Sequence, residues 1–311
     1  MSIAFVFPGQ GSQAVGMGKD LYERFDAVRR VYHIADDTLG FSLSRISFEG
    51  PVEELNRTEI TQPALLAASI AAYTVLKDAG VEPAIAAGHS LGECSALCAA
   101  GVFSLEDALR LTHERGRLMQ SAVPEGKGLM AAVLGLERDL IEETLSSVSS
   151  GYVAAANFNC PGQVVISGEK NAVEEAMALL KDKRAKRVLP LPVSVPSHCR
   201  LMDEAAESLG RFIDLMALSD PVFPVVNNAD AKPISNKNSV CNSLVRQLKT
   251  PLYWEDSIKR MVSDGVDTFV EVGPGRVLSG LIRRISSDVR VLNVQDLPSL
   301  EKTLTALGGN K

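Results

Sequence analysis

The chain has 311 residues, 46% of them hydrophobic and 23% charged, which are the proportions of an ordinary globular protein. This length predicts one large domain with a smaller one, and the formal net charge of -6 argues against a nucleic-acid-binding surface, which needs a dense lysine and arginine face. The N-terminus lacks the features of a signal peptide, and no apolar run reaches the roughly 18 residues of a membrane span, so we expect a soluble cytoplasmic protein.

Five cysteines are scattered along the chain without a paired C-x-x-C spacing, which indicates a reducing environment. Cys94 and Cys98 lie four residues apart on a predicted helix, a spacing that could hold a metal. None of the four histidines is placed to complete such a site, so we expect buried thiols and no metal.

The first 125 residues alternate short apolar strands with amphipathic helices. Residues 3–7 form a predicted strand, and residues 62–79 a helix. A second strand over 84–89 turns directly into a helix over 91–100, and Ser104 caps the helix that follows. This alternation predicts an α/β domain with a mainly parallel sheet and helices on both faces.

From residue 128 the pattern changes to six elements in quick succession. The predicted order is strand, helix, strand, strand, helix, strand, over residues 129–134, 138–147, 152–157, 163–167, 172–181 and 187–193. This order is that of a ferredoxin-like domain. We therefore expect an inserted domain over residues 127–196, within a large α/β domain made of residues 1–126 and 197–311. Further strands are predicted at 222–226, 268–272 and 290–294.

Ser90 lies in the run Gly88-His89-Ser90-Leu91-Gly92, where a predicted strand ends and a helix begins. In such a tight turn the flanking positions must be small, and the turn holds the serine hydroxyl over the C-terminal edge of the sheet. The backbone N–H of Leu91, in the first helical turn, points to the same place and can stabilise an oxyanion. We interpret Ser90 as the nucleophile of an acyl-transfer enzyme. The alternative is a plain turn in which Ser90 only caps the helix.

A serine nucleophile needs a general base, which is most often histidine. His33 and His113 fall on polar helix faces, and strand alternation is expected to turn His89 away from the nucleophile. His198 lies in a proline-bounded loop, from which a side chain can reach the edge of a site. We therefore predict His198 as the base, with His89 as the alternative.

Arg115 falls on the core-facing arc of a predicted helix over 105–119, with Arg110, Glu114 and Arg117 on the opposite face. A guanidinium that faces the core must be paired, and its planar fork suits a carboxylate. The partner is either an Asp or Glu of this chain or, beside an acyl-transfer serine, an acyl substrate that carries a free carboxylate.

The glycine-rich run over residues 9–14 formally satisfies the loose dinucleotide pattern G-x-G-x-x-A after a strand. No strand ending in Asp or Glu follows about 20 residues later, so we reject nucleotide binding. We expect instead a loop that carries Gln10 to the active site.

Short motifs extend from one end of the chain to the other: Phe7-Pro8-Gly9-Gln10-Gly11-Ser12-Gln13, Thr61-Gln62-Pro63-Ala64, Gly88-His89-Ser90-Leu91-Gly92-Glu93, Arg115-Gly116, Asn157, Pro196-Ser197-His198, Val245-Arg246-Gln247-Leu248 and Gly273-Pro274-Gly275. Their combination and order resemble the bacterial malonyl-CoA:acyl-carrier-protein transacylases, over nearly the whole chain. The resemblance implies a ping-pong transfer of malonyl from malonyl-CoA to acyl carrier protein in fatty-acid biosynthesis. It implies no cofactor, because the coenzyme A thioester is the substrate.

The resemblance also implies a role for each site residue. Ser90 carries malonyl as an ester, His198 moves the proton, and Arg115 pairs with the malonyl carboxylate. The supporting residues follow by the same resemblance: backbone N–H groups of Gln10 and Leu91 as the oxyanion hole, the backbone carbonyl of Gln247 as the group that orients the base, and Gln62 and Asn157 lining or bordering the pocket. The implied fold is an α/β-hydrolase-like core interrupted by a ferredoxin-like domain, and we expect a monomer.

Two other functions stay open from the residues alone. A serine thioesterase or hydrolase uses the same nucleophile, but its histidine normally comes late in the chain, and no histidine follows His198. A carrier-protein-binding subunit that keeps an inert serine is the non-enzymatic alternative. Polyketide synthesis is the alternative pathway for the transferred malonyl group.

Overall fold

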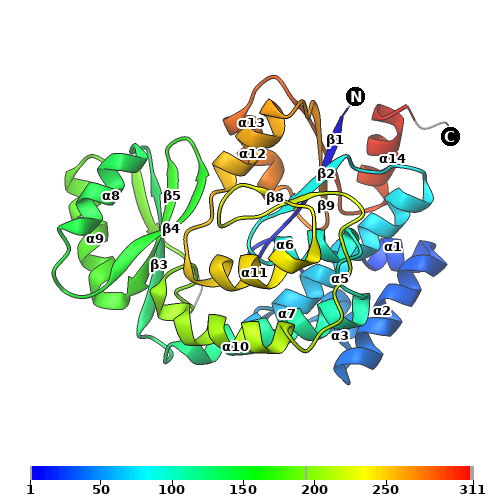
Figure 1. Cartoon of the computed structure of the whole chain (residues 1–311), viewed down its shortest axis with the longest axis horizontal. Coiled ribbons are helices and arrows are strands. Elements are labelled where there is room, and N and C mark those ends of the chain that lie inside the picture. Colours follow the sequence, from blue (N-terminus) through cyan, green and yellow to red (C-terminus); the bar gives the residue numbers. More distant parts are fainter. Residues whose placement is uncertain (1, 193–194, 309–311) are drawn as a thin grey trace.

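The computed structural model describes residues 2–192 and 195–308 (Figure 1). Two β-sheets organise these residues. A mainly parallel sheet lies in one part of the molecule with most of the helices around it, and an antiparallel sheet with two helices, drawn in green, lies beside it. The mixed α/β fold with two different sheets agrees with the sequence prediction.

The larger sheet has six strands in the described residues, in the order β10-β9-β1-β2-β7-β8. Their bounds are β1 (Ile3–Phe7), β2 (Ile85–Gly88), β7 (Val225–Val226), β8 (Pro233–Ile234), β9 (Thr268–Val272) and β10 (Arg290–Val294). Neighbouring strands pair in parallel except β8, which is antiparallel to β7. The strand predicted over 222–226 is shorter, because Pro224 has no N–H for the ladder and Val222 is 78% exposed.

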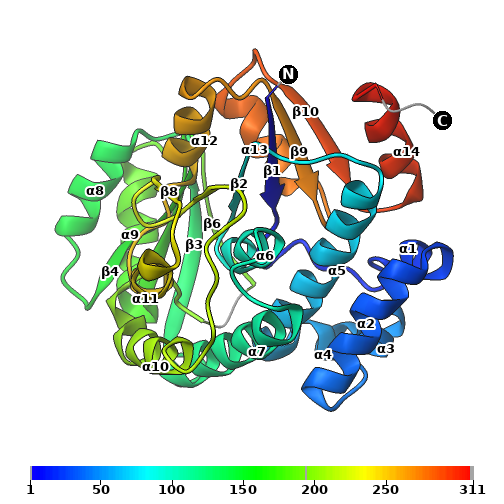
Figure 2. The ribbon, with the colours of Figure 1, turned by 45° about the vertical axis from the view of Figure 1, so that its right-hand side comes forward.

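Side chains of β1 alternate between the two faces of this sheet. Phe5 and Phe7 enter the larger core, whereas Ala4 and Val6 enter a second core formed largely with the helices over 254–263 and 277–285. The helices around the sheet are α1 (Lys19–Arg24), α2 (Asp26–Leu39), α3 (Leu43–Glu49), α4 (Val52–Leu55), α5 (Thr58–Asp78), α6 (Leu91–Ala99), α7 (Leu105–Ala122), α10 (Asp203–Ile213), α11 (Val240–Lys249), α12 (Trp254–Ser263), α13 (Val277–Ile285) and α14 (Leu297–Ala306), with single 3-10 turns at Arg200–Met202 and Lys237–Ser239. Figure 2 shows α1 to α4 gathered beside α5, on the side remote from the green unit.

Helix α5 begins four residues before the start predicted at Gln62, and Pro63 lies inside it. A proline cannot donate to the carbonyl four residues earlier, which is that of Glu59. The ring of His113 takes this place, because its Nδ1 lies 2.9 Å from the Glu59 oxygen and a carbonyl only accepts. His113 therefore has a structural role at the contact between α5 and α7.

The smaller sheet has the order β4-β5-β3-β6, with every neighbouring pair antiparallel. The elements are β3 (Gly128–Leu134), α8 (Arg138–Ser146), β4 (Val153–Cys160), β5 (Gln163–Glu169), α9 (Lys170–Asp182) and β6 (Arg187–Pro190). Their chain order is the predicted one. Strand β4 is longer than predicted, since Phe158 and Cys160 still pair with β5, and only Pro161-Gly162 is left for the turn. Val193, at the end of the predicted last strand, lies outside the described residues.

The two sheets enclose the site from opposite sides. Ala131 and Val133 of β3 pack under α8 and α9, whereas Met130 and Ala132 face a cavity on the other side of the strand. Backbone hydrogen bonds between β4 and Leu252, of 2.8 and 2.9 Å, join the smaller unit to the larger. The cavity therefore lies between the uncovered face of the antiparallel sheet and the carboxyl ends of β1 and β2.

Candidate active site

The turn at Ser90 joins β2 to α6 with a strained backbone. Ser90 has φ 52° and ψ -111°, in a region that L-residues rarely adopt. A Cβ on Gly88 would lie 1.8 Å from the carbonyl carbon of Gly92, and a Cβ on Gly92 would lie 2.0 Å from the oxygen of Phe7. Both positions therefore require glycine. The Ser90 side chain makes no capping hydrogen bond with α6, so the interpretation of Ser90 as a plain helix cap is wrong.

His198 lies next to this serine. Its Nε2 is 2.8 Å from the Ser90 Oγ, and its Nδ1 is 2.8 Å from the backbone oxygen of Gln247. Because a carbonyl only accepts, the hydrogen of the neutral ring is on Nδ1, which leaves Nε2 free to accept the serine proton. His198 is 2% exposed, and the backbone carbonyl of Gln247 orients its ring in the place that a carboxylate takes in other serine enzymes.

The surroundings keep His198 neutral. Burial and then the positive charge of Arg115 lower the pKa of His198 from 6.5 to about 3, against the opposite effect of the bond to Gln247. A neutral imidazole is the form that can take a proton, so the histidine is ready to act as a base over the whole neutral range.

Arg115 of α7 is 1% exposed and reaches the same serine. Its Nη2 donates to the Ser90 Oγ at 3.2 Å and to Oε1 of Gln247 at 2.9 Å, and its Nη1 donates to Oε1 of Gln62 at 2.7 Å. All three acceptors are neutral. Among the described residues no Asp or Glu pairs with this guanidinium, so the alternative of an internal carboxylate partner is wrong.

A cavity of about 240 Å³ opens at the Ser90 hydroxyl. Gln10, Leu91 and Asn157 line it together with Ser90, Arg115 and His198, so the structure brings six of the eight predicted site residues to one space. Gln62 and Gln247 are fully buried and are not among the lining residues. They lie behind Arg115, and their side-chain oxygens hold its two terminal nitrogens.

His89 lies in the cavity wall, and its ring is bonded to Asn159. Strand β2 ends at Gly88, so strand alternation does not apply to the next residue. The Nε2 of His89 is 2.9 Å from Oδ1 of Asn159, and its ring meets that of Trp254 edge-on at 5.6 Å. No hydrogen bond joins it to the nucleophile among the described residues, and burial lowers its pKa.

Sequence reasoning missed two fully buried polar residues behind the turn, Asn228 and Glu93. Asn228 follows β7, and its side chain bonds to the backbone N–H of Ser90 and to the backbone oxygen of Gly88, on either side of His89. Glu93 is the only charged residue of α6, a helix made otherwise of small and apolar residues. An acidic residue in such a buried helix is a signal that could have identified it, because a carboxylate is rarely buried without partners.

The described residues contain no group of three His, Cys, Asp or Glu side chains that could hold a metal ion. Cys94 is buried and Cys98 partly buried, and all five cysteines are free thiols. Within the same described ranges, no helix has the length and apolar character that a membrane crossing requires.

Residues 4–306 match the family described as the acyl transferase domain. This is the class of enzyme to which a serine paired with a histidine base, at the end of a parallel strand, also points.

The relatives of the chain are more specific. A malonyl CoA-acyl carrier protein transacylase from Haemophilus influenzae is 48% identical over 299 residues, which cover 95% of this chain and 96% of the relative. An acyl carrier protein S-malonyltransferase structure from Vibrio cholerae has a TM-score of 0.95 at 46% identity, covering 97% of this chain and 100% of that one. A malonyl-transacylase solved in complex with its type II PKS acyl-carrier protein has a TM-score of 0.96 at 46% identity, covering 98% and 100%. The chain belongs to the malonyl CoA-acyl carrier protein transacylase family.

Proposed function

We propose that this chain transfers the malonyl group of malonyl-CoA to the phosphopantetheine thiol of an acyl carrier protein, through a malonyl ester of Ser90, in fatty-acid biosynthesis. The observation that carries the proposal is the position of Arg115. A buried guanidinium with only neutral partners lies 3.2 Å from the nucleophile, where an acyl group with a free carboxylate would complete its pairing.

In the first half of the reaction the Ser90 Oγ attacks the thioester carbonyl carbon, and its proton passes to Nε2 of His198. The carbon–sulfur bond of the resulting tetrahedral intermediate then breaks, and the leaving coenzyme A sulfur takes the proton from His198. In the second half the carrier-protein thiol attacks the ester. His198 accepts the thiol proton and returns it to Ser90, so the enzyme is regenerated without a cofactor.

The oxyanion of both tetrahedral intermediates needs donors beside Ser90. Leu91 is the first residue of α6, where backbone N–H groups have no acceptor within the helix, and it lines the cavity. Gln10 lines the cavity from the loop after β1. We assign the two backbone N–H groups to the oxyanion hole, where one donor typically contributes about 3–4 kcal/mol of transition-state stabilisation.

We further propose that residues 1–126 and 197–311 form an α/β-hydrolase-like catalytic domain into which residues 127–196 are inserted as a ferredoxin-like domain. The β-α-β-β-α-β order and the strand order β4-β5-β3-β6 support the second assignment. We propose a monomeric enzyme, because the cavity and its polar residues come from a single chain. We also propose that it is cytoplasmic, because its five cysteines are free thiols, as in a reducing compartment.

Intact-mass measurement after mixing with malonyl-CoA tests the function. We expect a malonyl adduct on the wild-type enzyme and none on Ser90→Ala. The adduct should disappear when a carrier protein with a free phosphopantetheine thiol is added. Rapid release of free malonate without carrier protein would show a hydrolase instead. Absence of both the adduct and free malonate would show that the chain is neither a transferase nor a hydrolase of malonyl-CoA.

The carboxylate argument is tested by Arg115→Ala with malonyl-CoA and acetyl-CoA. Loss of a buried charged partner costs about 3–5 kcal/mol, so the preference for malonyl should fall by roughly two to four powers of ten. An unchanged preference in this variant would contradict the assignment of Arg115.

A further inference from the structure

Glu93 is a buried carboxylate that the proposed reaction does not use. It lies on α6, three residues after Ser90, and is 0% exposed. It is not among the residues that line the cavity. A fully buried carboxylate is costly, so its partners show what it does.

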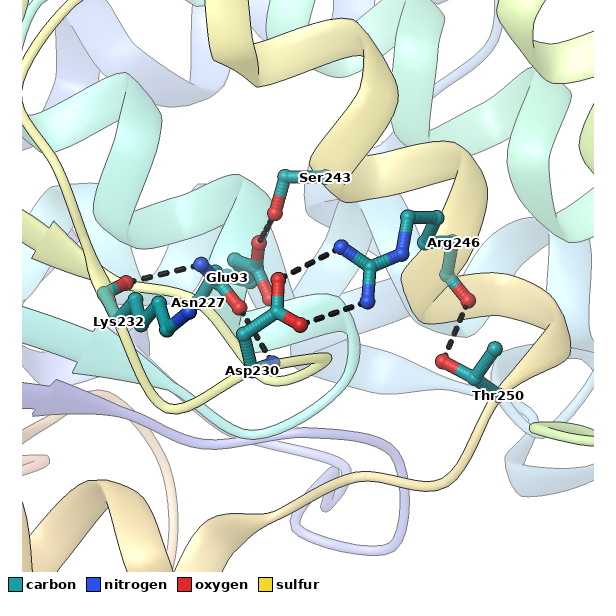
Figure 3. A network of polar contacts seen from close by, with 7 residues as sticks. All are labelled: Glu93, Asn227, Asp230, Lys232, Ser243, Arg246 and Thr250. Carbon is teal, nitrogen blue, oxygen red and sulfur yellow. Dashed lines mark hydrogen bonds and ion pairs between the residues drawn. The ribbon is translucent and has the colours of Figure 1, made fainter.

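Three donors point at the two oxygens of Glu93. Oε2 accepts from the backbone N–H of Asn228 at 2.9 Å and from Nε2 of Gln247 at 3.0 Å, and Oε1 accepts from the Ser243 hydroxyl at 3.1 Å. Figure 3 shows the Ser243 hydroxyl reaching down from α11 to this carboxylate. Burial raises the pKa of Glu93, whereas these donors and the charge of Arg115 favour the ionised form.

The bond to Gln247 fixes the direction of an amide group. Oε2 of Glu93 already accepts from the Asn228 backbone N–H, so it is an acceptor, and the NH₂ end of the Gln247 amide must face it, where it also donates to the backbone oxygen of Ser90 at 2.8 Å. The oxygen end must then face the other way, and it accepts from Nη2 of Arg115 at 2.9 Å. A reversed amide would present its NH₂ group to the guanidinium, and Arg115 would lose this acceptor.

Glu93 also supplies negative charge without occupying the place of a substrate. It favours the charged form of Arg115, against the burial that lowers the pKa of that arginine, yet one amide separates the two groups. A direct ion pair would compete with a substrate carboxylate for the guanidinium. A carboxylate one amide away leaves the arginine charged, oriented and available.

We propose that Glu93 is a positioning residue for acyl-group selectivity: through the amide of Gln247 it holds the guanidinium of Arg115 toward the position of a substrate carboxylate beside Ser90. The inference rests on the proposed malonyl transfer. A merely structural Glu93 would tie α6 to α11, and its loss would then slow every acyl donor equally.

The test compares single-turnover acylation of Ser90 by malonyl-CoA and by acetyl-CoA, which lacks the carboxylate. In Glu93→Gln the amide of Gln247 no longer faces an acceptor-only group, so the ratio of the two rate constants should fall on the order of 10- to 100-fold, the effect of one charge-assisted hydrogen bond. The acetyl rate should stay within about threefold of wild type, because the bond between Ser90 and His198 is unchanged.

Ser243→Ala is the matched control. It removes a hydrogen bond of similar length from the other carboxylate oxygen and leaves the bond to Gln247 in place. Its malonyl-to-acetyl ratio should equal that of wild type. A Glu93→Gln enzyme with the wild-type ratio, or one that loses both rates in parallel, would overturn the inference. Absence of a malonyl adduct in wild type would instead contradict the proposed function itself.

A second variant serves if Glu93→Gln does not fold. The exchange Glu93→Gln with Gln247→Glu keeps one buried carboxylate and one amide at the same contact, but it places the carboxylate directly on Arg115. The malonyl preference should be lost in this folded protein, because the guanidinium then has an internal partner. A retained preference would contradict the role of the intervening amide.

Discussion

The side chain of Asn228 makes two hydrogen bonds to the turn that carries Ser90. Its Oδ1 accepts from the Ser90 backbone N–H at 2.8 Å, and its Nδ2 donates to the backbone oxygen of Gly88 at 2.7 Å. The two bonds flank His89, directly before Ser90, whose φ is positive at 52°. Strained backbone of this kind persists only where neighbouring groups determine it, and Asn228, which is 0% exposed, is such a group.

The replacement Asn228→Ala should therefore make the position of the Ser90 hydroxyl less fixed and lower the stability of the protein. Two buried backbone groups lose their partners, so we expect a loss of about 2–4 kcal/mol in the free energy of unfolding and a fall in kcat of roughly 10- to 100-fold, measured by denaturant unfolding and by malonyl transfer.

The neighbouring Asn227→Ala provides the comparison for this variant. Asn227 bonds to Lys232 and Asp230 in its own loop, and within the described ranges it has no side-chain hydrogen bond to the turn at Ser90. The Asn227→Ala variant should have a lower free energy of unfolding, while its kcat stays within about twofold of wild type. Equal losses of kcat in the two variants would contradict the role of Asn228.

The contrast between these asparagines and Ser90 shows what the sequence can and cannot predict. The turn at Ser90 was predictable because local rules govern it: a strand, two glycines and a helix start determine where the hydroxyl points. Asn228 lies 138 residues away from Ser90, and its function depends on how β7 aligns beside β2. Nothing in its own neighbourhood indicates that contact.

The same distinction applies to the predicted elements. Strands over 3–7, 268–272 and 290–294 were predicted to the residue because they are apolar runs bounded by turns. The start of α5 was predicted four residues too late for a tertiary reason, since the packing of His113 supplies a donor for the Glu59 carbonyl that Pro63 leaves free. His89 lies one residue beyond the end of β2, so strand alternation could not predict that it lines the cavity.

The low pKa of His198 should be visible in the pH dependence of acylation. The histidine works as a base when neutral, and neutral imidazole predominates above its pKa of about 3. Single-turnover acylation should therefore change less than twofold between about pH 7.5 and 5.5. A histidine with an unperturbed pKa would become largely protonated over this range and lose about tenfold.

In Arg115→Gln the positive charge near His198 is absent, so the pKa of the histidine should rise and the acid limb should move toward neutrality. Acetyl-CoA is the donor for this comparison, since it does not need the arginine. A tenfold fall for the wild-type enzyme over the stated range would show that the ring is more hydrated than the structure indicates.

Gly116 should be sensitive to a single added methyl group. A Cβ there would lie 2.6 Å from the Cα of Glu59 and from the oxygen of Thr58, so α7 could no longer approach α5 as closely. Gly116→Ala should lower the free energy of unfolding by about 1–3 kcal/mol, as overpacking typically does. It should also weaken malonyl acylation, because Arg115 precedes this residue.

Gly280→Ala gives the opposite expectation for the same chemical change. Gly280 is also inside a helix, but a Cβ there meets nothing within 4 Å. Alanine should stabilise α13 by about 0.5–1 kcal/mol. Thermal unfolding of Gly116→Ala and Gly280→Ala measures the change in stability of each variant. Destabilisation of equal size in the two would refute the packing argument.

The last prediction separates the two histidines of the cavity. His198→Ala removes the group 2.8 Å from the Ser90 Oγ, so the rate constant of acylation should fall by the roughly 10²- to 10⁴-fold typical of a lost general base. His89→Ala removes a ring that bonds to Asn159 instead, so acylation should fall less than tenfold, with any larger effect confined to KM. Stopped-flow release of coenzyme A thiol, followed for both variants at one pH, gives the two rate constants. Near-normal acylation by His198→Ala, or an equal loss in both variants, would transfer the role of base away from His198.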